Sequence, residues 1–171
     1  MDLLSPSPDL VVRPATGDDV HDLAPRLRQD DLQEIADMTG LAPLEALGMA
    51  FVESNRRFAI VYKGRVSAIM GVVESPHCTD PRLGIVWMMG SDDVALFGYS
   101  MTRYARAWLL ELCDGYDVVG NLVSEANVTH VRFLKRLGAR IVRGYEDYGP
   151  GHVTALEFVF TLESLQESPS V

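Results

Sequence analysis

The sequence predicts a mixed α/β domain whose elements follow the order β-α-α-β-β-β-α-β-α-β-β. The first observation is an apolar strand at 84–90 (GIVWMMG), which stops at polar residues and leads into an amphipathic helix. The second is a strand at 117–123 that gives way to Asn127 and the helix VTHVRFLKRLG. The third is a pair of β-runs at 57–64 and 65–75, joined by a tight Lys-Gly turn typical of hairpins.

Shorter signals place the other elements. An alternating run at 10–15 predicts the first strand, and Thr16 supplies the N-cap of the helix that follows it. Gly40 ends a second helical segment, and Pro43 opens another. The last two strands flank a Gly-Pro-Gly turn at 149–151.

Composition is ordinary for a globular protein, with 47% hydrophobic and 23% charged residues in a chain of 171. We expect a single domain over 1–171, with loose polar tails at 1–8 and 163–171. The net charge of −9 argues against a nucleic-acid-binding face. No run of 18 apolar residues and no signal-peptide pattern is present, so we expect no membrane insertion. The expected compartment is a reducing cytoplasm or a particle assembled there.

One local cluster departs from the acidic balance. Basic residues gather near the last helix: Arg132, Lys135, Arg136, Arg140 and Arg143. They are either a solvated helix face with cations near the helix C-terminus, where the dipole favours them, or an anion subsite for a nucleotide phosphate or an acidic partner.

The two cysteines, Cys78 and Cys113, lack any metal-ligand spacing, and no metal is expected. Cys113 follows an apolar helix and is predicted to be a buried thiol. The neighbouring His77 and Cys78 could suggest a nucleophile, but no orienting carboxylate is evident, so a surface loop is the favoured interpretation.

The chain order from Trp87 to Gly138 resembles the Gcn5-related N-acetyltransferase (GNAT) superfamily. The segment 121–138 (NLVSEANVTHVRFLKRLG) is similar to the small GNAT-like internal virion or morphogenesis proteins of T7-like short-tailed phages. The resemblance implies an α/β (α+β) fold with a mixed, mostly antiparallel sheet of about six to seven strands and helices on both faces. It also implies acetyl-CoA as cofactor, an amine-bearing protein or small molecule as acceptor or other virion proteins as partners, and a place in the host cytoplasm or the virion.

The resemblance further implies where the cofactor binds. The fourth and fifth strands would part, and the cofactor's arm would lie along the edge that carries Trp87, Met88 and Met89. The family's phosphate loop, Gln/Arg-x-x-Gly-x-Gly/Ala, corresponds here to Ala95-Leu-Phe-Gly98-Tyr99-Ser100. Gly98 matches this pattern, Ser100 is a small replacement, and Ala95 lacks the family's long side chain.

Two asparagines are further candidates. Asn127 is predicted to be the N-cap of the last helix, and the resemblance implies a contact with the cofactor's arm. Asn121 is a polar amide within an apolar strand, where it either satisfies splayed backbone or lines a site.

The acid and base of the family are missing. The position of its usual tyrosine holds Leu134, beside Phe133, and the strand LGIVWMMG contains no carboxylate. Glu74 and Tyr99 are the substitute candidates for catalysis. Three functions follow as hypotheses: an acetyl-CoA-dependent N-acyltransferase with degenerate catalytic residues, a non-catalytic fold used in phage virion assembly, or an acidic binder of a host protein.

Overall fold

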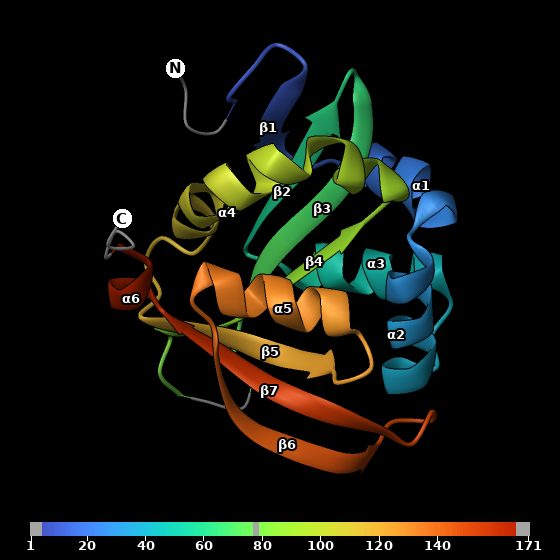
Figure 1. The fold of residues 1–171 in the computed structure, drawn as a ribbon, viewed down its shortest axis with the longest axis vertical. Coiled ribbons are helices and arrows are strands. Elements are labelled where there is room, and N and C mark those ends of the chain that lie inside the picture. Colours follow the sequence, from blue (N-terminus) through green and yellow to red (C-terminus); the bar gives the residue numbers. More distant parts are fainter. Residues whose placement is uncertain (1–4, 77–78, 167–171) are drawn as a thin grey trace.

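Seven strands form one twisted sheet in the order β1-β2-β3-β4-β5-β7-β6 (Figure 1). The computed structural model of the protein describes residues 5–76 and 79–166. Its strands are β1 Leu10–Pro14, β2 Arg56–Tyr62, β3 Arg65–Glu74, β4 Leu83–Gly90, β5 Val118–Ser124, β6 Arg140–Tyr148 and β7 Val153–Thr161. Neighbouring strands are antiparallel except β4 and β5, which run parallel. The predicted mixed, mostly antiparallel sheet is therefore confirmed.

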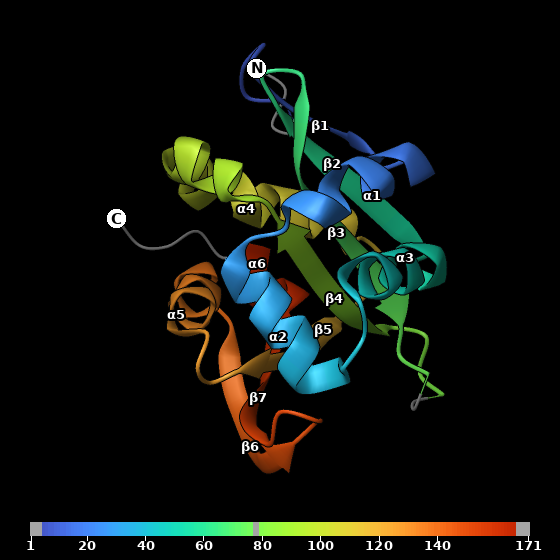
Figure 2. The same cartoon turned by 90° about the vertical axis from the view of Figure 1, so that its right-hand side faces the viewer.

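Helices cover both faces of the sheet (Figure 2). They are α1 Gly17–Leu23, α2 Gln29–Thr39, α3 Pro43–Glu53, α4 Gly98–Leu112, α5 Val128–Leu137 and α6 Leu162–Gln166, with 3-10 segments η1 Ala24–Arg26 and η2 Asp92–Phe97. The helices α1, α2 and α3 lie on one face, and α4 and α5 lie on the other. None of the single helices in the described ranges is long and apolar enough to cross a membrane; only α2 and α3 as a bent pair meet that test, by length and composition.

The observed order has three helices before β2, where the predicted order counted two. Gly40 ends α2 with a left-handed φ of 69°, and Pro43 restarts the chain as α3. Both signals are present in the sequence, and together they make two separate helices because a left-handed residue interrupts the helical path.

The end of the chain also differs from the expected tail. Residues 162–166 form α6 beyond β7, and Leu162 and Leu165 are buried. This apolar pair at i, i+3 spacing packs on one helix face, so the segment up to Gln166 is part of the packed domain. Its polar neighbours hide that signal in the sequence.

The predicted hairpin and first cap are confirmed. Lys63 and Gly64 both have positive φ, 49° and 78°, as a two-residue turn between right-twisted strands requires. The side chain of Thr16 accepts a hydrogen bond from the N–H of Asp19 and caps α1.

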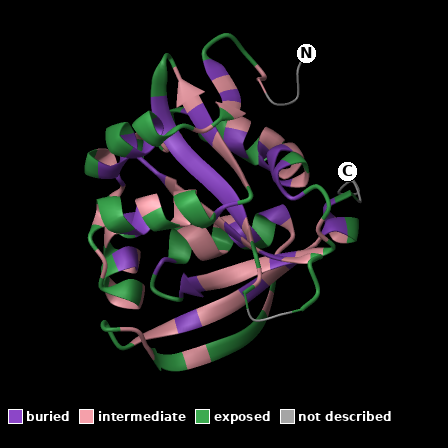
Figure 3. Cartoon of the chain, turned by 180° about the vertical axis from the view of Figure 1, so that it is seen from behind, coloured by how far each residue is buried: buried purple, intermediate pink, exposed green. Residues whose placement is uncertain are grey.

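The core lies in two apolar layers, one on each face of the sheet. The strand β3 is buried along nearly its whole length, whereas β6 is an exposed edge (Figure 3). Cys113, the C-cap of α4, is fully buried, as predicted, and burial raises the pKa of its thiol to about 12. At that value the thiol stays protonated and is a packing group rather than a nucleophile.

Candidate functional site

The strands β4 and β5 part from each other partway along their length. Their ladder contains three pairs and ends at Ile85↔Gly120, so 86–90 of β4 have no strand partner on that side. Among the described strands this is the only parallel contact, and β4 and β5 diverge beyond it (Figure 1). The notch expected between the fourth and fifth strands is therefore present.

Asn121 closes the base of this notch. Its amide Nδ2 donates to the carbonyl of Val86 at 3.0 Å, and its Oδ1 accepts from the N–H of Leu122 at 2.8 Å. The side chain thus satisfies two backbone groups that a continuous ladder would have paired. Asn121 therefore satisfies the splayed backbone and also lines the cavity, and a role in binding stays a prediction.

The other end of β4 is held by the start of α2. The N–H of Gly90 donates to Asp31 Oδ2 at 2.8 Å, and its carbonyl accepts from the N–H of Arg28 at 2.9 Å. The outward backbone groups of both Val86 and Gly90 thus have partners. Met88 lies midway between them, and strand alternation points its N–H and C=O toward the notch as well.

A cavity of about 240 Å³ fills the notch. Trp87 and Met88 both line it, although neighbouring side chains on a strand point to opposite faces. Side chains from α4 and α5 line one part, and side chains from α2 line the other. The cavity therefore passes through the plane of the sheet and joins its two faces.

Three titratable residues line this mostly apolar cavity: Asp31, Glu34 and His130. The carboxylate of Asp31 is engaged by the Arg28 guanidinium, at 2.7 and 3.1 Å, as well as by Gly90. Asp31 is therefore a structural residue. Glu34 and His130 are the two other titratable residues of the cavity, and they are the candidates for a role in proton transfer.

Glu34 joins α2 to the end of β5 and the start of α5. Its Oε1 accepts from the N–H of Ser124 at 2.7 Å, and its Oε2 accepts from the amide of Asn127 at 2.9 Å. The Nδ1 atom of His130 lies 3.7 Å from Oε2. Burial alone would raise the pKa of Glu34, but these contacts outweigh it and hold that pKa below the ordinary value of 4.5.

We expect this contact set to stabilise the fold in a pH-dependent way. Because the folded-state pKa of Glu34 is lowered, its contribution is present above the ordinary value of 4.5 and is lost as pH falls through the folded-state pKa. In urea unfolding, the stability advantage of the wild type over Glu34→Gln should shrink steadily below that value. Glu125→Gln is the control, because it removes an exposed carboxylate in the turn that directly follows β5. Its free energy of unfolding should differ from that of the wild type by less than about 0.5 kcal/mol at every pH.

Four of the eight predicted cofactor residues lie at the notch. Trp87, Met88, Met89 and Asn121 line the cavity. The indole N–H of Trp87 donates to Ser54 Oγ at 2.9 Å, which fixes the ring. Asn127 is the N-cap of α5, as predicted, since its Oδ1 accepts from the N–H of His130 at 3.2 Å.

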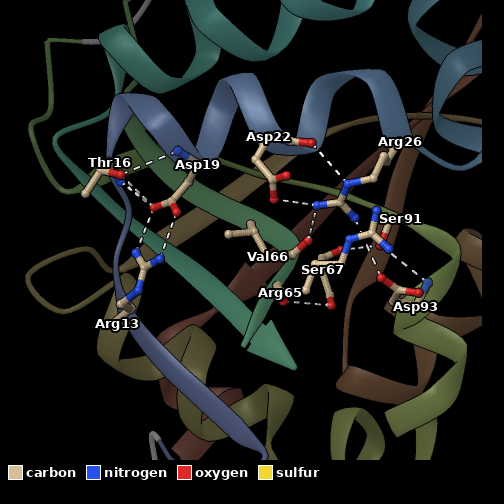
Figure 4. A network of polar contacts seen from close by, with 10 residues as sticks. All are labelled: Arg13, Thr16, Asp19, Asp22, Arg26, Arg65, Val66, Ser67, Ser91 and Asp93. Atoms are coloured by element: carbon tan, nitrogen blue, oxygen red, sulfur yellow. Dashed lines mark hydrogen bonds and ion pairs between the residues drawn. The ribbon is translucent and has the colours of Figure 1, made fainter. Parts of the chain in front are cut away.

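The segment after β4 is more ordered than the predicted loop. It forms η2, in which the N–H of Gly98 already donates to Ala95, and α4 begins at Gly98. Asp93 in this segment lies 3.6 Å from Arg26, which also bonds Val66 of β3 (Figure 4). The helix start is thus anchored to the N-terminal half, next to a negative charge.

The glycine of this segment is not required by the fold. An added Cβ at Gly98 would meet no atom within 4 Å, and its φ of −53° suits any residue. Ser100 follows within the first turn of α4 and is half-buried. Packing therefore does not explain a glycine at this position.

The two catalytic candidates from the sequence lie outside the cavity. Glu74 is exposed at the end of β3 and pairs with Gly84, at the opposite end of β4 from the notch. Tyr99 is 77% exposed, and its hydroxyl accepts from Arg103 at 3.4 Å. Phe97 is buried against the ring of Tyr62, so neither aromatic residue of this segment fills the notch.

The predicted basic cluster is not part of the cavity lining. Of the basic cluster, Lys135 and Arg136 occupy the last turn of α5, where they complement the helix dipole. The anion-subsite alternative stays a prediction. His77 and Cys78 lie outside the described residues, and the part of the chain that is described contains no group of three or more His, Cys, Asp or Glu fit for a metal.

Sequence reasoning did not identify Glu34 and His130. Both are polar residues on amphipathic helices, and they are 96 positions apart in the chain. The available signal is weak: His130 stands three residues after the cap Asn127, on the face that the apolar residues of α5 share.

Comparison with solved structures shows that this arrangement, a mostly antiparallel sheet of seven described strands with helices on both faces, is the GNAT fold. A GCN5-related N-acetyltransferase from Kribbella flavida matches with a TM-score of 0.70 and 17% identity, over 91% of this chain and 99% of that one. AAC(6')-Ib, solved with ribostamycin and coenzyme A, matches at 0.69 and 15% identity, over 95% and 98%. Mycobacterium smegmatis RimJ, solved with CoA-disulfide, matches at 0.68 and 16%, over 93% and 85%. No family model and no curated protein sequence matches the chain.

Proposed function

We propose that the protein binds acetyl-CoA in the notch between β4 and β5 and transfers its acyl group to an amine. The observation that carries this proposal is the end of the β4–β5 ladder at Ile85↔Gly120, with the cavity of about 240 Å³ beyond it. Matching structures with the same fold were solved with coenzyme A or its disulfide, which supports the assignment.

The residues at the notch fit this cofactor. The backbone N–H and C=O of Met88 face the open side, where an amide-bearing arm can pair with them as an added strand would. The walls from α4 and α5 are apolar, as a methylene-rich chain requires. Gly98 keeps open space at the start of α4, where a phosphate can approach the backbone.

In this arrangement the cofactor supplies an activated acyl thioester, and the chain supplies position and exclusion of water. Met88 and Asn121 would position the cofactor's arm along β4, and Trp108 and Phe133 form part of the apolar wall of the cavity. The through-going cavity lets the acceptor amine arrive from the α2 side, opposite the cofactor. Glu74 and Tyr99, which lie outside the cavity, have no direct contact with the reacting groups in this scheme.

The test is Gly98→Glu. The fold has room for the side chain, but the new carboxylate would lie in the path of the phosphates and repel them. We expect calorimetry to show about 30-fold weaker binding of acetyl-CoA, a loss of about 2 kcal/mol. Gly48→Glu on α3 is the matched control, since Gly48 is also a helical glycine with open space around it. Equal affinities for the two variants would contradict the loop assignment, and no binding to the wild type would contradict the function itself.

A second candidate function is a non-catalytic role of the same fold in phage virion assembly or inside the virion. The observation that favours it is the apolar pair Phe133 and Leu134, which line the cavity where the family's acid would stand. β4 likewise carries no carboxylate. Under this alternative, the protein would be found in purified particles, and Gly98→Glu would leave particle formation unchanged.

A further inference from the structure

The cavity contains an imidazole that the fold leaves without a hydrogen-bond partner at one nitrogen. His130 Nδ1 is buried and has no partner, although the side chain as a whole is 18% exposed. The exposed fraction therefore belongs to other atoms of the side chain. Glu34 Oε2 lies 3.7 Å from Nδ1, which is slightly too long for a hydrogen bond. Catalytic hydrogen bonds are often this long before a substrate binds.

The position of Glu34 is set by other groups. The N–H of Ser124 and the amide of Asn127 each donate to one carboxylate oxygen, and these two bonds hold the side chain in place beside the ring. Asn127 holds both partners, because its Oδ1 also accepts from the backbone N–H of His130. One asparagine thus fixes the carboxylate and the helix turn that carries the imidazole.

Few other charged groups surround this pair. From α2, Arg28 and Asp30 lie near Glu34, but Arg28 is engaged by Asp31. Asp37 and Asp30 line a smaller cavity of about 70 Å³ that adjoins Glu34. The residues that β4, β5 and α4 contribute to the main cavity do not titrate.

We infer that His130 accepts the proton of the acceptor amine, with Glu34 as its positioning residue; this inference rests on the proposed function. With a proton on Nδ1 directed at Glu34, the imidazole carries its lone pair on Nε2. That lone pair takes one proton from R–NH₃⁺, and the electron pair of the broken N–H bond stays on the amine as its nucleophilic lone pair. The imidazolium then returns the proton to solvent. This pair takes the place of the base that β4 lacks.

The first test measures the tautomer of His130 without any turnover. Long-range ¹H–¹⁵N spectra at about pH 8.5, well above the ordinary histidine pKa of about 6.5, should show the proton on Nδ1. Glu34→Gln should lose this preference. A wild-type ring protonated on Nε2 would overturn the inference and leave the proposed function intact.

The second test measures transfer to two probe amines, spermidine and benzylamine, with acetyl-CoA affinity determined separately. His130→Gln should lower kcat about 100-fold and remove the rise of rate with pH, while acetyl-CoA affinity stays within about twofold. Glu34→Gln should lower kcat about tenfold. His152→Gln is the matched control, since His152 also pairs with a carboxylate, Asp147, but both are about 75% exposed on the β6–β7 turn.

The outcomes separate the two claims. Acetyl-CoA that fails to bind the wild type overturns the proposed function. A pH profile that His130→Gln leaves unchanged overturns the inference alone. Binding of acetyl-CoA by the wild type without transfer to either amine contradicts the transfer step of the proposed function, and the inference with it. Partial recovery of His130→Gln by added imidazole would support proton transfer over a structural role.

Discussion

Gly149→Val should lower the free energy of unfolding by about 3 kcal/mol. The turn between β6 and β7 lies directly on the end of α2, where a Cβ at Gly149 would stand 2.4 Å from the carbonyl oxygen of Asp37 and 2.7 Å from that of Met38. Both are backbone atoms and cannot rotate away. Gly149 also has a φ of 68°, which a β-branched residue adopts at a cost of roughly 1–2 kcal/mol; overpacking adds a comparable amount.

For a chain of this length, that loss corresponds to a fall in Tm of about 6–12 °C. The N–H of Gly151 donates to Asp37 at 2.8 Å, so its hydrogen exchange should speed up as the turn lifts from α2. The control is Gly144→Val in the same hairpin, where an added Cβ meets only Leu156 at 3.7 Å. If the two variants melt together, the turn is not held on α2.

Local signals carried most of the fold prediction. The Lys63-Gly64 turn, the Thr16 cap and the Gly149-Pro150-Gly151 turn each depend on backbone preferences of a few adjacent residues, and all three are found where expected. The features that the sequence did not predict depend instead on contacts between residues distant in the chain. The helix α6 is stabilised by packing of Leu165 against residues distant in the sequence. Its five residues are too few to show a helical pattern in the sequence.

The part of the candidate site that could be predicted is the part marked by a polar residue within a single apolar strand. Asn121 stands out because an amide in an apolar run requires a partner, and the structure supplies two. Glu34 and His130 meet only when α2 and α5 approach from opposite faces of the sheet, through the gap between β4 and β5. No local pattern encodes that meeting, because a carboxylate on an amphipathic helix is normally on the solvated face.

Asn121→Leu should cost about 3 kcal/mol of stability and weaken acetyl-CoA binding at least tenfold. Leucine has nearly the same shape but leaves the carbonyl of Val86 and the N–H of Leu122 without partners, and each buried unpaired group costs about 1–3 kcal/mol. The amide also sets the separation of the strands where the notch begins. Urea unfolding and calorimetry would measure the two effects on the same protein samples.

Asn121→Asp separates the two hydrogen bonds of this side chain. A carboxylate keeps the bond from the N–H of Leu122, but it sets an oxygen against the carbonyl of Val86 where the amide donated. The introduced carboxyl should therefore have a raised pKa in the folded state, because only its protonated form can donate to Val86. A group with a raised folded pKa stabilises at low pH, so the deficit of this variant should shrink as pH falls. A deficit that stays constant with pH would mean that the donor to Val86 contributes nothing, and that the strands are held apart by packing alone.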